Sequence, residues 1–306
     1  MGLLILNPGT SATVQDRGRA GYREFGVPEG GAFDRSSFGM ANALVGNGPG
    51  EAALELTLVG GVYRATHRLA LALAGAPMTA RIEGRDGLTP LAIPQSFALD
   101  EGDRLVLGGS ARGVRAYLAV RGGWRTAPFL GGRSSERRLE AGETLPAEAG
   151  TIATRRPARA DLPDPADGPI RLVDGPDGPV PPALLGSPYW VGGASDRIGL
   201  RLDGPAIVGA DRPGRASSPT AAGAVQVAGG RAIVLGVAGG TMGGYPHVAH
   251  VIAADLDRLA QARPGAPLTF ARIEPAEARR LDRDRRARLA VRDRRIGLAA
   301  GAGAGD

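Results

Sequence analysis

The chain has 306 residues, of which 43% are apolar and 22% charged, a balance typical of a globular protein with one large domain or two of about 150 residues. It contains no cysteine and no lysine, which excludes disulfides, thiolate nucleophiles, cysteine-bound metals, P-loop or Schiff-base lysines, and a lysine that carries biotin. The net charge of +6 is spread along the chain without a basic block interleaved with aromatic residues, so we expect no nucleic-acid partner.

The chain is rich in turn-forming residues, with 49 glycines and 24 prolines, and only 4% of its residues are aromatic. Short apolar runs separate the glycines and prolines, which predicts a mainly β fold with a core of leucine, valine, isoleucine and alanine. The opening "MGLLILNPG" lacks a basic leader, and no apolar run reaches 18 residues. We therefore expect a cytoplasmic protein with no membrane partner.

The first half of the chain reads as strands around one helix. "LLIL" (3–6) predicts a strand, and "DRSSFGMANALVGN" (34–47) predicts a helix, with Asp34 as its N-cap and Gly46 as its stop. Further strands are expected at 52–58, 68–74, 104–109 and 114–120. This spacing favours a barrel or sandwich over alternating βα units.

The second half repeats that character after a proline-rich linker at 154–169. Strands are expected at 170–176, 206–210, 224–228 and 231–240, and helices at 255–263 and 274–290. The pattern divides the chain into an N-terminal half, 1–155, and a C-terminal half, 170–290. Residues 291–306, which end in "GLAAGAGAGD", are expected to form a disordered tail.

The stretch "TVQDRGRAGYREFGVPEGGAFDR" (13–35) holds five glycines and four arginines just before the expected helix. Amides freed by glycine, together with a helix start, suit an anion, and arginine binds a carboxylate through two parallel hydrogen bonds. The stretch therefore predicts a cradle for a carboxylate or a developing oxyanion. The side chains assigned to this cradle are Gln15, Asp16, Arg17 and Arg19 in the loop, and Asp34 and Arg35 at the helix start. The alternative is a tight interdomain turn with a surface Asp–Arg pair.

Two strand-like segments carry further charged candidates. If "SDRIGLR" (195–201) is extended, Arg197 and Arg201 share one face, suited to an anionic substrate, and Asp196 lies on the other. The alternative is an ordinary ion pair at a loop end. In "ALELTL" (53–58), Glu55 faces away from the apolar side and points either into a cleft or into water.

The stretch "TMGGYP" (241–246) has two glycines for close backbone approach, and the hydroxyl of Tyr245 suits donation to a carbonyl oxygen. The alternative is a turn that ends a strand, with Tyr245 packed against the fold. His247 and His250 follow, but no third ligand is near them in the sequence, so we interpret them as structural and expect no metal site.

These motifs, in this order over residues 3 to 275, resemble the family of the 5-oxoprolinase C subunit and KipA-like proteins, which includes allophanate hydrolase subunit 2 and the carboxyltransferase domain of urea carboxylase. The resemblance implies two cyclophilin-like β-barrel domains around a shared cleft. It also implies one of three roles: a component of ATP-dependent 5-oxoproline hydrolysis to glutamate, carboxyl transfer from carboxybiotin to urea, or regulation by binding a KipI-like partner. A purely structural β-barrel protein remains the alternative from another class.

Together with the residue patterns, the resemblance gives two sets of candidate site residues. The catalytic candidates are Gln15, Asp16, Asp34 and Tyr245. The substrate-binding candidates are Arg19, Arg35, Glu55, Asp196, Arg197, Arg201, Gln226, Thr241, Gly243 and Gly244. The expected ligand is a small carboxylate or amide.

The chain departs from the family pattern at three positions. Ser218 and Ala238 stand where carboxylates are expected, which removes two candidate general bases, and Met242 replaces a threonine. Because the chain has no lysine, ATP is expected to act through partner proteins of the A-like and B-like (KipI-like) types, and biotin to arrive only on another protein. We expect activity only in the presence of those partners.

Overall fold

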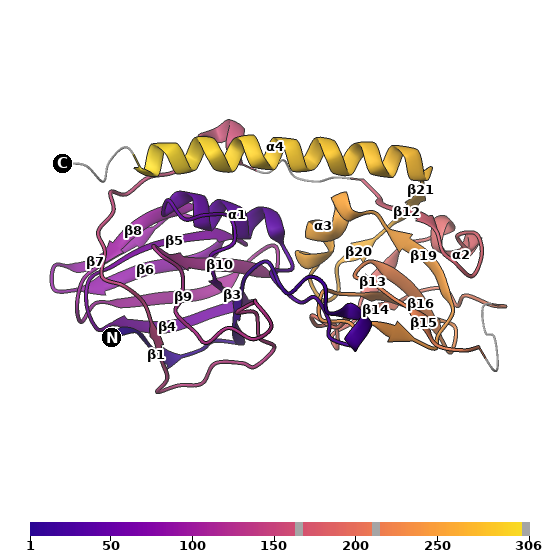
Figure 1. Cartoon of the computed structure of the whole chain (residues 1–306), viewed down its shortest axis with the longest axis horizontal. Coiled ribbons are helices and arrows are strands. Elements are labelled where there is room, and N and C mark those ends of the chain that lie inside the picture. The colour runs from indigo at the N-terminus through magenta and orange to yellow at the C-terminus, as the bar shows by residue number, and fades with distance from the viewer. Residues whose placement is uncertain (163–167, 210–214, 302–306) are drawn as a thin grey trace. The chain divides into compact units, whose positions relative to one another are not determined.

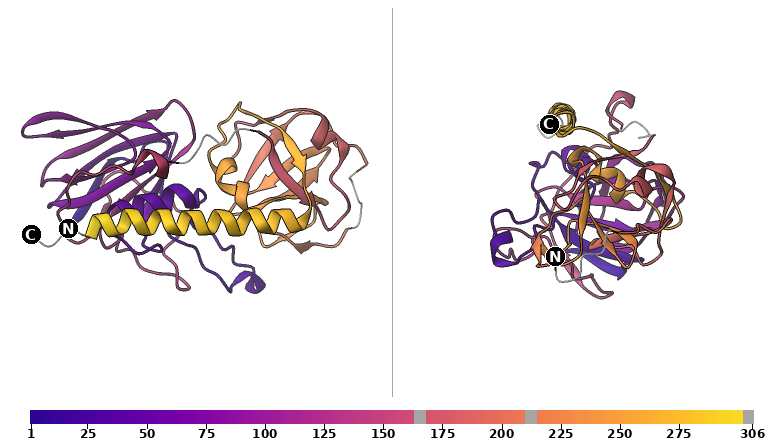
Figure 2. Two further views of the ribbon diagram at one scale, coloured as in Figure 1. Left: turned by 90° about the horizontal axis from the view of Figure 1, so that it is seen from above. Right: turned by 90° about the vertical axis from the view of Figure 1, so that its right-hand side faces the viewer.

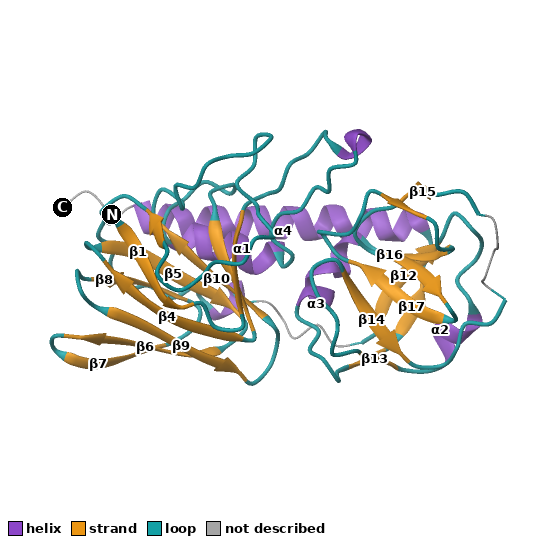
Figure 3. Cartoon of the chain, turned by 90° about the horizontal axis from the view of Figure 1, so that it is seen from below, coloured by secondary structure: helices purple, strands orange, loops and turns teal. Residues whose placement is uncertain are grey.

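The computed structural model describes residues 1–162, 168–209 and 215–301, which fall into two compact units. Of the described residues, the first unit comprises 1–18, 34–162 and 288–301, and the second comprises 19–33, 168–209 and 215–287. Strands dominate both units and helices are few, which confirms the predicted mainly β fold (Figure 3). The domain limits at 155 and 170 stay predictions, as does the shared cleft.

The first unit contains two antiparallel sheets (Figure 1). The six-stranded sheet has the order β11 (Thr144–Pro146), β1 (Gly2–Asn7), β4 (Val59–Ala65), β9 (Arg104–Ser110), β6 (Met78–Gly84) and β7 (Gly87–Leu91). The five-stranded sheet has the order β2 (Ser11–Gln15), β3 (Ala53–Thr57), β10 (Arg115–Val120), β5 (Leu69–Gly75) and β8 (Gln95–Leu99).

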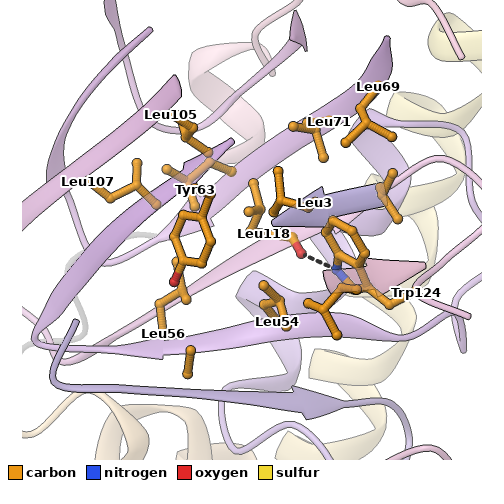
Figure 4. Close-up of a cluster of buried hydrophobic side chains, with 14 of the residues drawn as sticks. Leu3, Leu54, Leu56, Tyr63, Leu69, Leu71, Leu105, Leu107, Leu118 and Trp124 are labelled. Carbon is orange, nitrogen blue, oxygen red and sulfur yellow. Dashed lines mark hydrogen bonds between the residues drawn. The ribbon is translucent and has the colours of Figure 1, made fainter. Parts of the chain in front are cut away.

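Apolar side chains of both sheets form the core of this unit. Leu3 and Tyr63 come from the six-stranded sheet and Leu54 and Leu118 from the five-stranded one, and all four are fully buried (Figure 4). The indole Nε1 of Trp124 donates to the Leu118 carbonyl at 3.0 Å, so the largest core side chain leaves no polar atom unsatisfied.

Helix α1 (Arg35–Leu44) packs on β10 and β5 of the five-stranded sheet. It begins after Asp34, whose side chain accepts from the Ser37 amide, and Gly46 follows its C-cap with φ +75°. The predicted cap and stop are both confirmed.

The second unit is built on one eight-stranded sheet. The order is β20 (Pro267–Leu268), β13 (Tyr189–Val191), β14 (Gly199–Asp203), β17 (Arg231–Leu235), β16 (Ala224–Ala228), β19 (His247–Val251), β12 (Ile170–Asp174) and β21 (Phe270–Arg272). Because β20 and β21 stand at opposite ends of this order and only Thr269 separates them in the chain, the sheet nearly closes into a barrel.

Smaller elements complete the second unit. A separate two-stranded ribbon pairs β15 (Ser218–Pro219) with β18 (Met242–Gly243). Short helices are α2 (Pro182–Gly186), α3 (Leu256–Ala260) and the 3₁₀ turns η1 (Arg23–Phe25) and η3 (Ala253–Asp255), and a further turn, η2 (Arg159–Asp161), lies in the first unit. The predicted helix at 255–263 corresponds to α3.

The strand predicted at 231–240 ends at Leu235, and two other predicted elements differ more strongly from the structure. Residues 206–209 form no strand, although Ile207 is buried and Val208 exposed in a strand-like alternation; residue 210 lies outside the described residues. The Ile207 amide instead makes a single bond to the Gly230 carbonyl, at 2.9 Å. A ladder of such bonds, which alternation alone cannot provide, is what defines a strand.

The predicted disordered tail is also wrong for residues 291–301, which continue helix α4 (Pro275–Gly301; Figure 2). Ile296 and Ala300 are buried, and the Arg292 guanidinium donates to the Ser36 hydroxyl at 2.9 Å and to its carbonyl at 2.7 Å. These contacts order a segment whose composition suggested disorder. Residues 302–306 lie outside the described residues.

Candidate functional site

The candidate site residues fall into two groups, one in each unit. The first unit holds Gln15, Asp16, Asp34, Arg35 and Glu55. The second unit holds Arg19, Asp196, Arg197, Arg201, Gln226, Thr241, Gly243, Gly244 and Tyr245. Their convergence on one ligand stays a prediction, and each group is described by itself.

Glu55 lies on a polar row across the five-stranded sheet. The strand register places Thr13, Glu55 and Tyr117 directly beside one another on β2, β3 and β10. Leu54 and Leu56 point to the opposite face, into the core. Glu55 is 1% exposed, so the expectation that its side chain points into water is wrong.

The Glu55 carboxylate is held by two side chains of β10. Arg115 Nε donates to Oε1 at 3.1 Å, and the Tyr117 hydroxyl donates to Oε2 at 2.6 Å. The same hydroxyl accepts from the backbone amide of Asp34 at 2.8 Å. Burial, with the nearby negative charges of Glu55 and Asp34, raises the pKa of Tyr117 well above its usual value, so the hydroxyl keeps its proton and remains a donor.

Asp34 uses its carboxylate to start α1. One oxygen accepts from the Ser37 amide at 2.9 Å and the other from the Ser37 hydroxyl at 2.6 Å. A cap of this kind contributes about 1 kcal/mol to helix stability. Arg35, the first residue of α1, is exposed. The structure therefore gives Asp34 a structural task, and its catalytic role stays a prediction.

Asp16 and Gln15 hold the end of β2 against a distant loop. Asp16 accepts from the Gly18 amide at 2.7 Å, from the Ser134 hydroxyl and from the Arg133 amide. The Gln15 Nε2 donates to the Thr13 hydroxyl at 2.9 Å and to the Ser135 carbonyl at 2.8 Å. With three donors, the charge of Asp16 is compensated without a bound ligand.

The five glycines of the opening stretch all adopt positive φ, from 66° at Gly30 to 89° at Gly21. Other residues adopt this conformation only at a cost, which accounts for the unusual glycine content. In the second unit, the Gly30 amide donates to the Val237 carbonyl at 3.1 Å, and Arg19 donates its amide to the Glu29 carbonyl at 2.8 Å. The stretch is thus a backbone-bonded loop, and anion binding by it stays a prediction.

Asp196, Arg197 and Arg201 do not form the predicted arrangement. Asp196 accepts from the amides of Ile198 and Gly199, at 2.8 and 3.1 Å, so this segment turns before β14 begins. Arg197 is buried and donates to the Gly31 carbonyl at 2.8 Å, whereas Arg201 is exposed. The predicted shared face of the two arginines is wrong, because the Asp196 side chain supports a turn where the pattern predicted an extended strand.

Gln226 and His247 stand opposite one another on β16 and β19. Both are buried, and no hydrogen bond reaches Gln226 Nε2 or His247 Nδ1 from the described residues. His247 Nε2 lies 3.4 Å from His250 Nδ1. Burial lowers the pKa of both imidazoles, that of His250 to about 4 with a further contribution from His247, so both are neutral at pH 7.

The "TMGGYP" segment forms the ribbon strand β18 and the turn after it. The Thr220 amide donates to the Thr241 carbonyl at 2.9 Å, and its hydroxyl donates to the Gly240 carbonyl at 2.7 Å. Tyr245 is 54% exposed, so the alternative in which this ring packs against the fold is wrong. Gly244 is also exposed.

Arg215 fastens the ribbon to the barrel. Its guanidinium donates to the Gly243 carbonyl at 3.1 Å and to the Ser218 hydroxyl at 2.6 Å, and pairs with Asp177 at 2.8 Å. Asp177 in turn accepts from the His247 amide at 2.6 Å. Ser218, which replaces an expected carboxylate, therefore serves as a partner of Arg215.

Sequence reasoning missed several members of these clusters, among them Arg115, Tyr117, Arg215 and Thr220. Alternation along 114–120 assigns Arg115 and Tyr117, like Glu55, to the sheet face opposite the apolar core. This alternation is the sequence signal that could have identified both residues. Arg215 and Thr220 had no comparable signal.

Among the described residues, no group of three or more histidine, aspartate or glutamate side chains is placed to hold a metal ion. No helix in the described part of the chain is long and apolar enough to cross a membrane.

Comparison with known families identifies the class of protein. The model of the carboxyltransferase domain, subdomain A and B, matches residues 25–272. The chain therefore belongs to the carboxyltransferase domain family, which confirms the resemblance found in the sequence motifs.

Individual relatives narrow this class. The C subunit of 5-oxoprolinase from Escherichia coli K12 is 32% identical over 298 residues, covering 92% of this chain and 94% of that protein. A urea amidolyase of Lachancea kluyveri is 30% identical over 322 residues, covering 90% of this chain but 17% of that enzyme. The first relative is one component of an enzyme and the second match is part of a larger enzyme, which supports the role of an enzyme component for this chain.

Solved structures show the same architecture. The K. lactis urea amidolyase superposes with a TM-score of 0.85 at 26% identity, covering 95% of this chain and 20% of that chain. The Kluyveromyces lactis urea carboxylase gives 0.84 at 27% identity, covering 95% of this chain and 29% of that chain. The chain thus spans less than a third of these two enzymes.

Proposed function

We propose that this chain is the carboxyltransferase-like subunit of a multi-component 5-oxoprolinase, which opens 5-oxoproline to glutamate with the use of ATP. The observation that carries the proposal is its similarity to the C subunit of E. coli 5-oxoprolinase over 92% of this chain and 94% of that protein. The match to the urea amidolyase of L. kluyveri covers only 17% of that enzyme.

The residues present do not fit biotin carried on this chain or ATP bound in a P-loop. The chain has no lysine to carry biotin or to complete a P-loop, so we derive no step through either group. Under this proposal, A-like and B-like partner proteins supply the ATP-dependent step. The task of this chain is to bind and orient the small amide.

The second unit offers suitable groups for that task. Tyr245 is exposed on the turn that follows β18, and its hydroxyl can donate to a ligand oxygen. The buried amide of Gln226 lies beneath Gly243 of the same ribbon: a Cβ on Gly243 would approach its Nε2 to 2.3 Å. Neutral donors of this kind suit an amide carbonyl, whose oxygen gains negative charge when the carbonyl is attacked.

A second candidate function is biotin-dependent carboxyl transfer to urea or a related amide. The family description and the structural similarity to the urea carboxylase of Kluyveromyces lactis favour it. Under this alternative, biotin arrives on another protein. A third candidate is a regulatory protein that binds a KipI-like partner, favoured by Ser218 and Ala238 in place of expected carboxylates.

One reconstitution separates the three candidates. The chain is purified together with an A-like and a B-like protein and supplied with ATP and 5-oxoproline, and glutamate and ADP are measured with and without avidin. We expect glutamate only when all components are present, and no effect of avidin. Carboxylation of urea that needs bicarbonate and a biotinylated carrier, without glutamate, would replace the proposal with the second candidate. Binding to the B-like protein with neither activity would favour the third.

A further inference from the structure

The amide of Gln226 is an unsatisfied donor in the interior of the second unit. Gln226 is 5% exposed, and its Nε2 has no hydrogen-bond partner among the described residues. A buried donor without a partner bears the full cost of losing water, so such groups are rare unless they have a ligand or a bound water. Its position therefore calls for an explanation.

The surroundings of this donor are polar but neutral. His247, opposite Gln226 across the β16–β19 pair, is a neutral imidazole at pH 7. Arg215, which donates to the Gly243 carbonyl of the ribbon, is paired with Asp177 at 2.8 Å, so its charge is balanced. A neutral donor in such a site suits an uncharged carbonyl oxygen better than a carboxylate, which needs a positive partner when buried.

The ribbon of β15 and β18 covers the donor and is separate from the eight-stranded sheet. A Cβ added to Gly243 would lie 2.3 Å from Gln226 Nε2 and 3.0 Å from the Thr220 methyl. Only glycine therefore allows the ribbon backbone to rest on the amide. Hydrogen bonds of Thr220 and Arg215 hold the ribbon in place.

We infer that Gln226 Nε2 donates to the carbonyl oxygen of a small amide, such as a lactam or a ureide, which reaches it when the β15–β18 ribbon lifts. The inference rests on the proposed function in its choice of ligand and deepens it by naming the group that recognises the amide. It also gives Gly243 a defined role, as the position where backbone closes directly over the bound carbonyl.

The first test compares stability and binding in one variant of the full-length chain. Gln226→Met keeps the length of the side chain and removes the donor, so the variant should unfold at the same temperature as the wild type or higher. Binding of 5-oxoproline, measured by calorimetry, should weaken about three- to tenfold, as expected for one lost hydrogen bond. Proline, which has the ring and carboxylate but no lactam carbonyl, should bind both proteins equally weakly.

The second test compares alanine substitutions at two glycines. Gly243→Ala places a methyl group against Gln226 Nε2 and should weaken 5-oxoproline binding at least as much as Gln226→Met. Gly193→Ala is the matched control, because a Cβ at that exposed position meets no atom within 4 Å. Equal binding by the two alanine variants would overturn the role given to Gly243.

The remaining outcomes separate this inference from the proposed function. If 5-oxoproline fails to bind the wild type but 2-pyrrolidinone or urea binds and depends on Gln226, the amide site stands and the proposed substrate is wrong. If Gln226→Met lowers the unfolding temperature and leaves binding of all three probes unchanged, the amide holds a structural water only, and the inference is overturned.

Discussion

Both units place polar side chains opposite one another across antiparallel strands, but they differ in whether those side chains find hydrogen-bond partners. The facing pairs are Glu55 beside Tyr117 in the first unit, and Gln226 beside His247 in the second. Glu55 and Tyr117 bond to each other and, through Asp34, to the start of α1. Gln226 has a buried donor with no partner in the described residues.

This difference indicates which polar residues fix the fold and which are available to a ligand. A network whose members satisfy one another makes the geometry rigid, and removing one member leaves another buried and unpaired. A donor that is left unsatisfied has nothing to lose when it is removed, and gains a partner only when a ligand binds. Removing a member of the Glu55 network should therefore lower the free energy of unfolding, whereas removing the Gln226 donor should not.

The largest effect is expected from breaking the ion pair in the first unit. Glu55→Leu leaves the buried guanidinium of Arg115 without its carboxylate and should lower the free energy of unfolding by about 3–5 kcal/mol. Urea denaturation measures this change. The double variant Glu55→Leu with Arg115→Met removes both charges and should recover most of the loss. A single variant within about 1 kcal/mol of the wild type would show that this network does not hold the unit together.

Lowering the pH should reduce the stability of the second unit through His250. The pKa of His250 is about 4 in the fold against an ordinary 6.5, so the unfolded chain binds a proton first as the pH falls. The free energy of unfolding should stay level above pH 7 and fall between pH 6.5 and pH 4, by at most about 3 kcal/mol. The variant His250→Gln should flatten this decline in a pH series of denaturation curves. If the free energy of unfolding fell with pH as steeply in the variant as in the wild type, the assignment of this decline to His250 would be wrong.

Removing the hydroxyl of Tyr117 should cause a smaller loss of stability. Tyr117→Phe keeps the ring, which packs edge-on against Phe38 at 5.9 Å, but removes the bonds to Glu55 and to the Asp34 amide. We expect a loss of about 1–3 kcal/mol, because two buried polar groups lose a partner. Thermal unfolding followed by circular dichroism measures it. An unchanged midpoint would mean that Glu55 and Asp34 find other partners.

The smallest effect concerns the cap of α1. Asp34→Ala should cost about 1 kcal/mol, whereas Asp34→Ser, which keeps an oxygen acceptor for the Ser37 amide, should cost much less. Chemical denaturation of the two variants side by side measures the difference. Equal losses would show that the negative charge matters more than the cap.

Local sequence signals predicted much of the fold. Asp34 and Gly46 identified α1, and alternation identified β3 and β10, because these signals depend on neighbouring residues. The tail from 291 was mispredicted because its order comes from contacts of Arg292 with Ser36, which is 256 residues away.

The candidate sites were harder to predict. Alternation correctly turned Glu55 away from the core, but its partners Arg115 and Tyr117 lie about 60 residues further along, and only the strand register brings them together. The pattern at 195–201 failed because an Asp side chain can close a turn within an apparent strand. Gln226 and Gly243 were found as candidates, but their close approach was not predictable from spacing.

The most direct test of the account is the rate of glutamate formation from 5-oxoproline and ATP as this chain is titrated into fixed amounts of the A-like and B-like proteins. The account predicts no turnover without the chain and a rate that rises to a plateau at a fixed molar ratio. Full turnover by the other two proteins alone would contradict it.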